Sequence, residues 1–375
     1  MPGILLARLL RDAQLTLLMV VGEIWAFLVL TPWTWNGDGG PPGNRYFLST
    51  YPLMVFLLLV LSIVTFALFN AVPTDPARLT CGKTCTPEII AANRARLGLD
   101  QPIIVQYWDW LRAIFVGRTY GSGTATFACP APCLGYSYRQ QAPVTELIVN
   151  ALPATFYLAL GAFILWMAIG ISTGIYAAKR RGTWQDRTVL GVTLVGYSMP
   201  VFFIGLLLLI FLIVRLNLLP YPDYISPLEN PLQFLQTMIL PWIALAILYA
   251  AYYTRLTRSQ MLETLSEDFI RTARAKGLDE RRVLYGHIFR NAMLIPISGL
   301  PAAMIGVLFT GSMLIEVIFS LDGIGLLGFE AALNRDYPVM FGTLYFFGLL
   351  GLLIGLLGDV LYTVIDPRID FEARS

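Results

Sequence analysis

Few side chains in this sequence have the type and spacing that catalysis requires. The single histidine, His287, has no evident nucleophile or carboxylate partner, so we interpret it as a helix-surface residue. The apolar stretches show no Ser-His-Asp set and no metal-ligand spacing, and the chain has no Walker A loop. We therefore expect no catalytic residue, no metal and no cofactor on this chain.

Cysteine chemistry is confined to one segment. The four cysteines form two Cys-x₃-Cys pairs: Cys81, Cys85, Cys129 and Cys133. Four thiolates would be enough to bind zinc. Because we place the segment outside the cytoplasm, where conditions are oxidising, the sequence favours two disulfides over a metal. Three connectivities are possible, and the sequence does not choose among them.

A polar, basic stretch interrupts the apolar chain between Ser266 and Pro296. Its pattern predicts two short helices joined at Gly277, the first capped by Ser266 and the second by Asp279. We call residues 266–296 the island. A charged helix-turn-helix between hydrophobic segments indicates a docking element for another protein, and the alternative is an ordinary solvated loop.

The elements that must position the island are membrane helices. Of the 375 residues, 57% are hydrophobic and 13% are charged, whereas soluble domains average about 25% charged. The charge-free runs are too long for a soluble core, and each can supply the roughly 20 apolar residues of a membrane span. They predict six spans, near 52–71, 152–178, 189–213, 236–254, 294–315 and 340–359. The net charge of +2, with basic residues in short loops, argues against nucleic acid.

Charge distribution sets the orientation. The loop Lys179–Arg187 and the stretch Arg255–Arg290 are rich in Lys and Arg, which by the positive-inside rule places them, and the C-terminus, in the cytoplasm. The N-terminal end is ambiguous. Residues 1–12 form a basic amphipathic start, and the apolar run 14–31, broken by Glu23, fits an extra span, an interfacial helix or half of a hairpin. We favour the extra span.

Several short motifs in the sequence resemble those of one protein family. Thr272–Gly277 (TARAKG) and Glu280–Arg282 (ERR) resemble the coupling loop, or EAA loop, of binding-protein-dependent ABC importer permeases. The form is that of the B-type subunit in the dipeptide, oligopeptide and nickel subfamily. Arg271-Thr272-Ala273 stands where the general pattern has Glu-Ala-Ala, so the acidic residue is absent. Further similar words extend the resemblance over roughly Val72 to Ile369: Pro73–Arg78, Leu152–Thr155, Asn334–Val339 and Asp366–Arg368.

The resemblance implies an all-α polytopic membrane protein with a type I ABC importer transmembrane domain. It would have six core helices, an extra N-terminal hydrophobic helix and an extracytoplasmic scoop segment. The expected boundaries are an N-terminal region 1–50, a first core helix 51–71, a disulfide-bearing segment 72–146, a transmembrane domain 147–363 with coupling loop 255–292, and a cytoplasmic tail 364–375.

The resemblance also implies site residues. Those expected to contact an ATPase are Phe269, Arg271, Thr272, Ala273, Ala275, Lys276, Gly277, Leu278 and Asp279. Residues expected at the pathway or its outer mouth are Pro200, Glu316 and Asp322, although Glu316 fits a solvated helix end equally well. Pro200 is also expected to kink the third span.

The expected function is a non-enzymatic permease subunit that forms half of a translocation pathway for di- or oligopeptides. Its partners would be a homologous second permease, two ATP-binding subunits or one fused ATPase, an extracytoplasmic binding protein and membrane lipid. ATP and Mg would bind to the partner subunits. An oligosaccharide or nickel importer of the same fold is an alternative, as are two other classes, an ion-coupled secondary transporter and a membrane-anchored binding module.

Overall fold

The computed structural model describes residues 43–71, 86–97, 99–122 and 125–365. The chain divides into two compact units, one made of Met1–Leu59 with Pro367–Ser375 and the other of Val60–Asp366. The features below belong to the second unit, apart from the beginning of helix α2, Gly43–Ala71, which starts before the expected boundary at residue 51. The amphipathic start, the run 14–31, Cys81, Cys85 and the tail 366–375 lie outside the described residues.

Membrane-spanning helices dominate the described chain, which confirms the fold class. Among the described residues, four helical segments are long and apolar enough to cross a membrane: Val144–Lys179 (α6), Pro231–Leu265 (α9), Glu280–Phe319, and Tyr337–Gly358, which lies within α17, Tyr337–Ile365. They contain the expected spans 152–178, 236–254, 294–315 and, apart from its last residue, 340–359. The first expected span, 52–71, lies within α2, and the described side chains of Met54–Ala67 form an apolar stretch of it.

The segment Glu280–Phe319 is a chain of short helical pieces. They are α11 (Glu280–Arg282), η2 (Val283–Ile288), α12 (Phe289–Ala292), α13 (Leu294–Ser298), α14 (Leu300–Gly306), η3 (Val307–Gly311) and α15 (Ser312–Phe319). Pieces η2 and η3 are π-helical turns. Helix α16, Ile324–Asn334, follows and packs against α15, α6 and α17.

The third expected span is broken rather than kinked. Helix α7, Trp184–Ser198, ends before Pro200. After a bend of 99°, the chain continues as α8, Val201–Leu208, and then as the π-helix η1, Leu209–Arg215. Met199 and Pro200 are both in extended conformation, with ψ of 131° and 142°. A residue before proline is disfavoured in the helical region, so the chain turns here instead of continuing through a proline kink.

Helices α6 and α9 form the centre of the described fold. Gly170 and Gly174 of α6 lie so close to α9 that an added Cβ would stand 2.7 Å from Tyr253 Cβ and 2.6 Å from Thr257 Cβ, respectively. Small residues spaced in this way let two membrane helices approach closely. Gly191 of α7 makes no such close approach, because no described atom would lie within 4 Å of a Cβ there.

Between α2 and α6 the structure contains strands that the all-α expectation omitted. Helices α4 (Pro87–Leu97) and α5 (Ile103–Val116) precede a hairpin of β1 (Arg118–Ser122) and β2 (Ala125–Cys129), in which Arg118 pairs with Cys129. A second, two-residue pairing joins β3 (Tyr136–Ser137) to β4 (Ala142–Pro143). Cys129 and Cys133 form a disulfide. The two-residue strands are too short for an alternating pattern to reveal them, and the five-residue strands, RTYGS and ATFAC, do not alternate apolar with polar residues.

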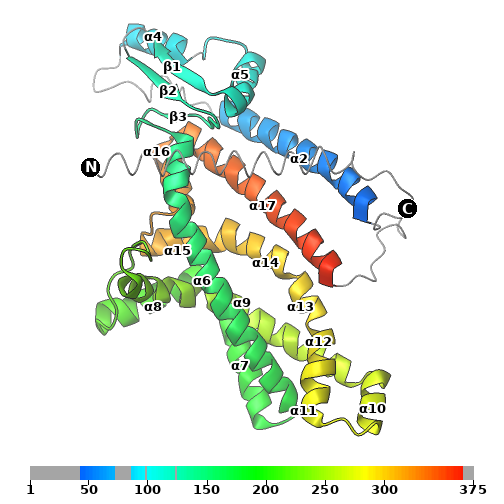
Figure 1. Cartoon of the computed structure of the whole chain (residues 1–375). Coiled ribbons are helices and arrows are strands. Elements are labelled where there is room, and N and C mark those ends of the chain that lie inside the picture. Colours follow the sequence, from blue (N-terminus) through cyan, green and yellow to red (C-terminus); the bar gives the residue numbers. More distant parts are fainter. Residues whose placement is uncertain (1–42, 72–85, 98, 123–124, 366–375) are drawn as a thin grey trace. The chain divides into compact units, whose positions relative to one another are not determined.

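The described part of the second unit has two distinct ends (Figure 1). Helix α16 and the strands lie where α6 and α17 begin, and the helices of the island lie at the opposite end, where α9 finishes. The candidate docking surface and the disulfide-bearing segment are therefore on opposite sides of the spans.

Candidate coupling site

The island continues directly from a membrane span. Helix α9 runs without interruption to Leu265, and Ser266 then ends it, with its hydroxyl donating to the carbonyl oxygen of Glu263 at 2.7 Å. The sequence predicted that Ser266 caps the next helix, and this prediction is wrong. Helix α10, Asp268–Ala275, begins after Glu267 without a side-chain cap. Movement of α10 is thus tied to the end of α9 by a connection of two residues.

The turn at Gly277 has the predicted form. Gly277 has φ of +75°, in the left-handed region that favours glycine, and its N–H donates to the carbonyl of Arg274 at 2.9 Å. Asp279 caps α11, with Oδ2 accepting from the N–H of Arg281 at 3.1 Å. Arg274 bridges the turn to Glu280, with Nη2 and Oε1 2.6 Å apart, an interaction that raises the pKa of Arg274. Both side chains are well exposed, so the pair adds little stability.

An apolar cluster seats the island on the ends of the spans. Ile270 and Val283 are fully buried and pack with Met261 of α9 and Ala178 of α6. Ala273, expected to contact an ATPase, is only 7% exposed and belongs to this cluster, so its side chain serves the chain's own core. Most of the other expected contact residues are exposed: Phe269, Arg271, Thr272, Ala275, Lys276, Gly277 and Asp279, with Leu278 half-buried. They form a surface that a partner can reach, fixed from behind by the cluster.

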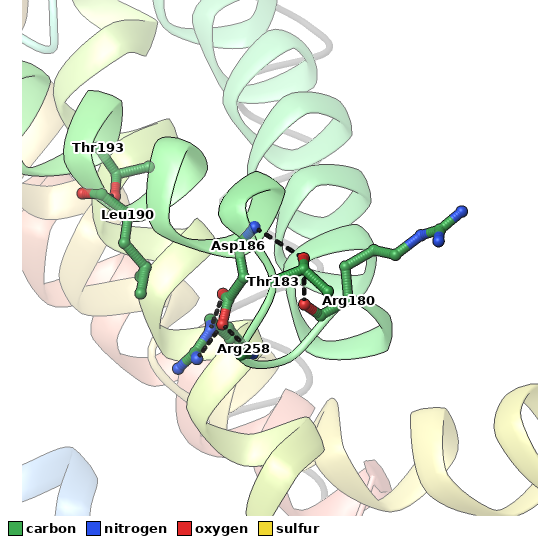
Figure 2. A network of polar contacts seen from close by, with 7 residues as sticks. Arg180, Thr183, Asp186, Leu190, Thr193 and Arg258 are labelled. Carbon is green, nitrogen blue, oxygen red and sulfur yellow. Dashed lines mark hydrogen bonds and ion pairs between the residues drawn. The ribbon is translucent and has the colours of Figure 1, made fainter.

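A buried ion pair holds the neighbouring loop to α9 (Figure 2). Arg258 donates from Nε to Asp186 Oδ1 at 2.7 Å and from Nη2 to Oδ2 at 2.8 Å. The side chain of Asp186 is 4% exposed and that of Arg258 20%. Asp186 also accepts from the N–H of Gly182 at 3.0 Å. The Thr183 side chain caps α7 by accepting from the backbone N–H of Asp186. The pair therefore ties the start of α7 to α9 within the same end of the molecule as the island.

Sequence reasoning missed this ion pair, although part of its signal was present. Thr183 and Asp186 have the Ser/Thr-x-x-acid spacing of a helix start, which explains how the loop holds the carboxylate in place. The partner, Arg258, lies in a different helix far along the chain. No local pattern identifies that pairing.

The residues expected at the outer mouth do not form one site. Glu316 is completely buried: Oε1 accepts from Thr155 Oγ1 at 2.8 Å, and Oε2 accepts from the N–H of Leu326 at 3.0 Å. A Cβ on Gly323 would lie 2.3 Å from the Glu316 carboxyl carbon, so that glycine makes room for it. Glu316 thus joins α15 and α6 to the start of α16, which fits neither an outer-mouth residue nor a solvated helix end. Asp322 and Pro200 are exposed.

A further buried carboxylate, Asp336, lies outside the spans. Asp336 is 7% exposed and accepts from Ser137 Oγ, which connects β3 to the start of α17. Burial raises the pKa of Asp336 above its usual value, although the bonds from Ser137 and Val339 and the charge of Arg139 oppose this.

The raised pKa of Asp336 predicts a pH effect on stability. Because the folded pKa exceeds the unfolded one, the protonated form stabilises the fold below the unfolded pKa, and this contribution is lost as pH rises through the folded pKa. Asp336→Asn should therefore remove part of the gain in thermal stability that the wild type shows on mild acidification. Melting curves of both proteins from pH 7 downward test this, and an identical pH dependence would contradict it.

Comparisons with known proteins agree with this architecture. The family model "Binding-protein-dependent transport system inner membrane component" matches residues 170–371, more than half of the chain, and the model of its N-terminal part matches residues 45–159. A putative peptide transport system permease protein of Brucella suis biovar 1 (strain 1330) is 39% identical over 316 residues, covering 84% of this chain and 96% of that protein.

Two further proteins extend the comparison. The dipeptide transport system permease protein DppB of Escherichia coli (strain K12) is 36% identical over 349 residues, covering 87% of this chain and 98% of its own length. Among solved structures, the inward-facing MetNI methionine ABC transporter matches 59% of this chain and 97% of its own chain, with 18% identity and a TM-score of 0.47. On the family match and the two relatives, this chain is a multi-pass inner-membrane protein and belongs to the family of binding-protein-dependent transport system inner membrane components.

Proposed function

We propose that this chain is one permease subunit of an ATP-driven importer of peptides. It pairs with a homologous second permease, and two ATP-binding subunits, or one fused ATPase, dock on the island from the cytoplasm. ATP and Mg bind to those subunits and not to this chain. An extracytoplasmic binding protein delivers the peptide, and the C-terminus is cytoplasmic.

The observation that supports this proposal is the packing of the island on the ends of the membrane spans. Its outer surface is exposed, its inner surface packs on the ends of α6 and α9, and α10 follows α9 after two residues. A rigid element of this kind transmits a partner's movement to the spans instead of absorbing it. The names of the relatives, a putative peptide permease and a dipeptide permease, support peptides as the cargo.

Co-purification with the ATPase subunits tests the docking surface directly. Ala275 is exposed at the end of α10, so Ala275→Arg adds bulk to the surface without touching the apolar cluster. Ala92→Arg, at an exposed helical alanine of α4 on the other side of the membrane, is the matched control. We expect the first variant to lose the ATPase and the second to retain it. Retention by both variants would show that the island is not the docking surface.

The turn at Gly277 offers a second test with a closely matched control. Gly277 and Gly182 both have positive φ, +75° and +78°, and an added Cβ would meet nothing within 4 Å at either site. Alanine therefore costs about 1–2 kcal/mol of backbone strain at both positions. Only Gly277→Ala changes the docking surface, so only it should reduce ATPase activity stimulated by the loaded binding protein. Equal losses in both variants would contradict this role.

A further inference from the structure

Helix α5 presents an apolar stripe to its surroundings. Ile104, Trp108 and Phe115 are 82%, 64% and 77% exposed, and their spacing places them on one helix face. On the opposite side, Trp110 and Ala113 are 7% and 1% exposed. The helix is therefore apolar on both sides, whereas a surface helix in water normally has one polar face.

The inner face of α5 lies against the membrane helices themselves. Tyr107 OH and Ser62 Oγ are 2.7 Å apart, and the Tyr107 ring meets that of Phe66 edge to face, with centroids 5.4 Å apart. Ser62 is nine residues from the end of α2 at Ala71, or about 13 Å along the helix axis. In Figure 1, α5 lies next to this end of α2. The contact is thus at the depth of the span.

Contacts between α5 and α17 independently place α5 at the same depth along the spans. The Trp110 ring lies 4.3 Å from that of Phe341 and 5.4 Å from that of Tyr345, centroid to centroid. Phe341 and Tyr345 belong to the first turns of the segment Tyr337–Gly358 that is apolar enough to cross the membrane. Helix α5 therefore lies beside the outer turns of two apolar helices.

The part of α2 that contacts α5 also exposes apolar side chains. Ile63 and Val64 of α2, the residues immediately after Ser62, are 52% and 48% exposed. In a chain embedded in a bilayer, apolar side chains exposed at this depth contact acyl chains. Trp108 also has the amphipathic ring that is enriched where hydrocarbon meets the headgroups.

A charged hollow lies beside the end of the stripe. It has a volume of about 500 Å³, and its lining includes Asp109, Arg112, Val116 and Arg118. Arg118 Nη2 lies 3.7 Å from Asp109 Oδ2, and both side chains are about one-third exposed. Two guanidinium groups with one carboxylate match the mixed charge of a phospholipid headgroup, whose phosphate arginine binds well.

We propose that α5 lies in the leaflet opposite the island, with Ile104, Trp108 and Phe115 among the acyl chains and Arg112 and Arg118 at the headgroup phosphates. The occupant of the stripe is membrane phospholipid. A helix held in this way anchors the disulfide-bearing segment at the membrane surface. The inference concerns this segment alone and is independent of the cargo and of ATPase docking.

Nitroxide accessibility in nanodiscs tests the inference on the full-length chain. Single labels are placed through Ile104→Cys, Trp108→Cys and Phe115→Cys, with Glu88→Cys as the control at an exposed charged position of α4. The unsubstituted chain measures background labelling of the native cysteines. We expect the three stripe labels to collide several-fold more with oxygen, which concentrates in lipid, and several-fold less with a water-soluble nickel chelate than the label at 88.

Two outcomes would overturn the inference. If nickel reaches the stripe labels as readily as the label at 88, the stripe is in water. If protection from nickel appears only after a purified binding protein is added, the stripe is a protein-docking surface. Quenching of Trp108 by brominated phospholipid provides a measurement without introduced cysteines. Wild type should show a quenched component that Trp108→Phe lacks, and equal quenching in both proteins would contradict the proposal.

Discussion

Replacing Asp186 with alanine is expected to destabilise the protein by about 3–5 kcal/mol, the usual cost of removing one partner from a buried ion pair. Arg258 would then be left charged and four-fifths buried, having lost both of its hydrogen bonds to the carboxylate. The start of α7 would lose its connection to α9 at the same time. Thermal unfolding in detergent, followed by the loss of the monodisperse protein peak, measures the effect.

Two variants define the cause of the expected loss. The double change Asp186→Leu with Arg258→Met removes both charges and should recover much of the stability, because apolar residues of similar volume can replace a buried pair. Arg255→Met is the control in the same helix: Arg255 lies 4.4 Å over the ring of Tyr197, a contact worth about 0.5–2 kcal/mol. If Asp186→Ala loses no more stability than Arg255→Met, the ion pair does not hold α7 to α9.

Gly174→Leu should have the second largest effect, because it separates the two central helices. A Cβ at Gly174 would stand 2.6 Å from Thr257 Cβ and 2.9 Å from the Thr254 carbonyl oxygen. The carbonyl belongs to the backbone of α9 and cannot move aside without moving the helix. Overpacking of this kind costs about 1–3 kcal/mol, or more where the backbone must move. A lower melting temperature and a smaller yield of folded protein are expected.

The control for Gly174 is Gly191 of α7, where a Cβ meets nothing within 4 Å. Gly191→Leu should be neutral or slightly stabilising, because leucine favours the helix more than glycine does. Gly174→Leu should also weaken stimulation of the ATPase by the binding protein, since α9 carries the island. Equal melting temperatures for the two variants would mean that the α6–α9 contact is looser than the structure shows.

What the sequence predicted well depends on local physics. Long charge-free runs identified most of the spans because the membrane requires a minimum apolar length. Gly277 and Asp279 were correctly placed at a turn and a helix start, since both roles depend on backbone angles and nearby N–H groups. The family resemblance rested on these same local words, and the comparisons confirmed it.

What the sequence did not predict depends on contacts between distant segments. The pairing of Asp186 with Arg258 and the burial of Glu316 under Thr155 join residues that are far apart in the chain. An acid at a span end looks solvated until the helix that covers it is known. Ser266 was misassigned because α9 runs farther than its apolar part, so the serine ends one helix instead of beginning the next.

In the function proposed for this chain, ATP hydrolysis by docked partners drives peptide passage through it. ATP-dependent uptake into proteoliposomes measures this, with the co-purified complex, its binding protein and a labelled peptide. We expect uptake that requires ATP and the binding protein and that is lost with Ala275→Arg on this chain. Uptake driven by an ion gradient without any ATPase subunit would contradict it and favour a secondary transporter.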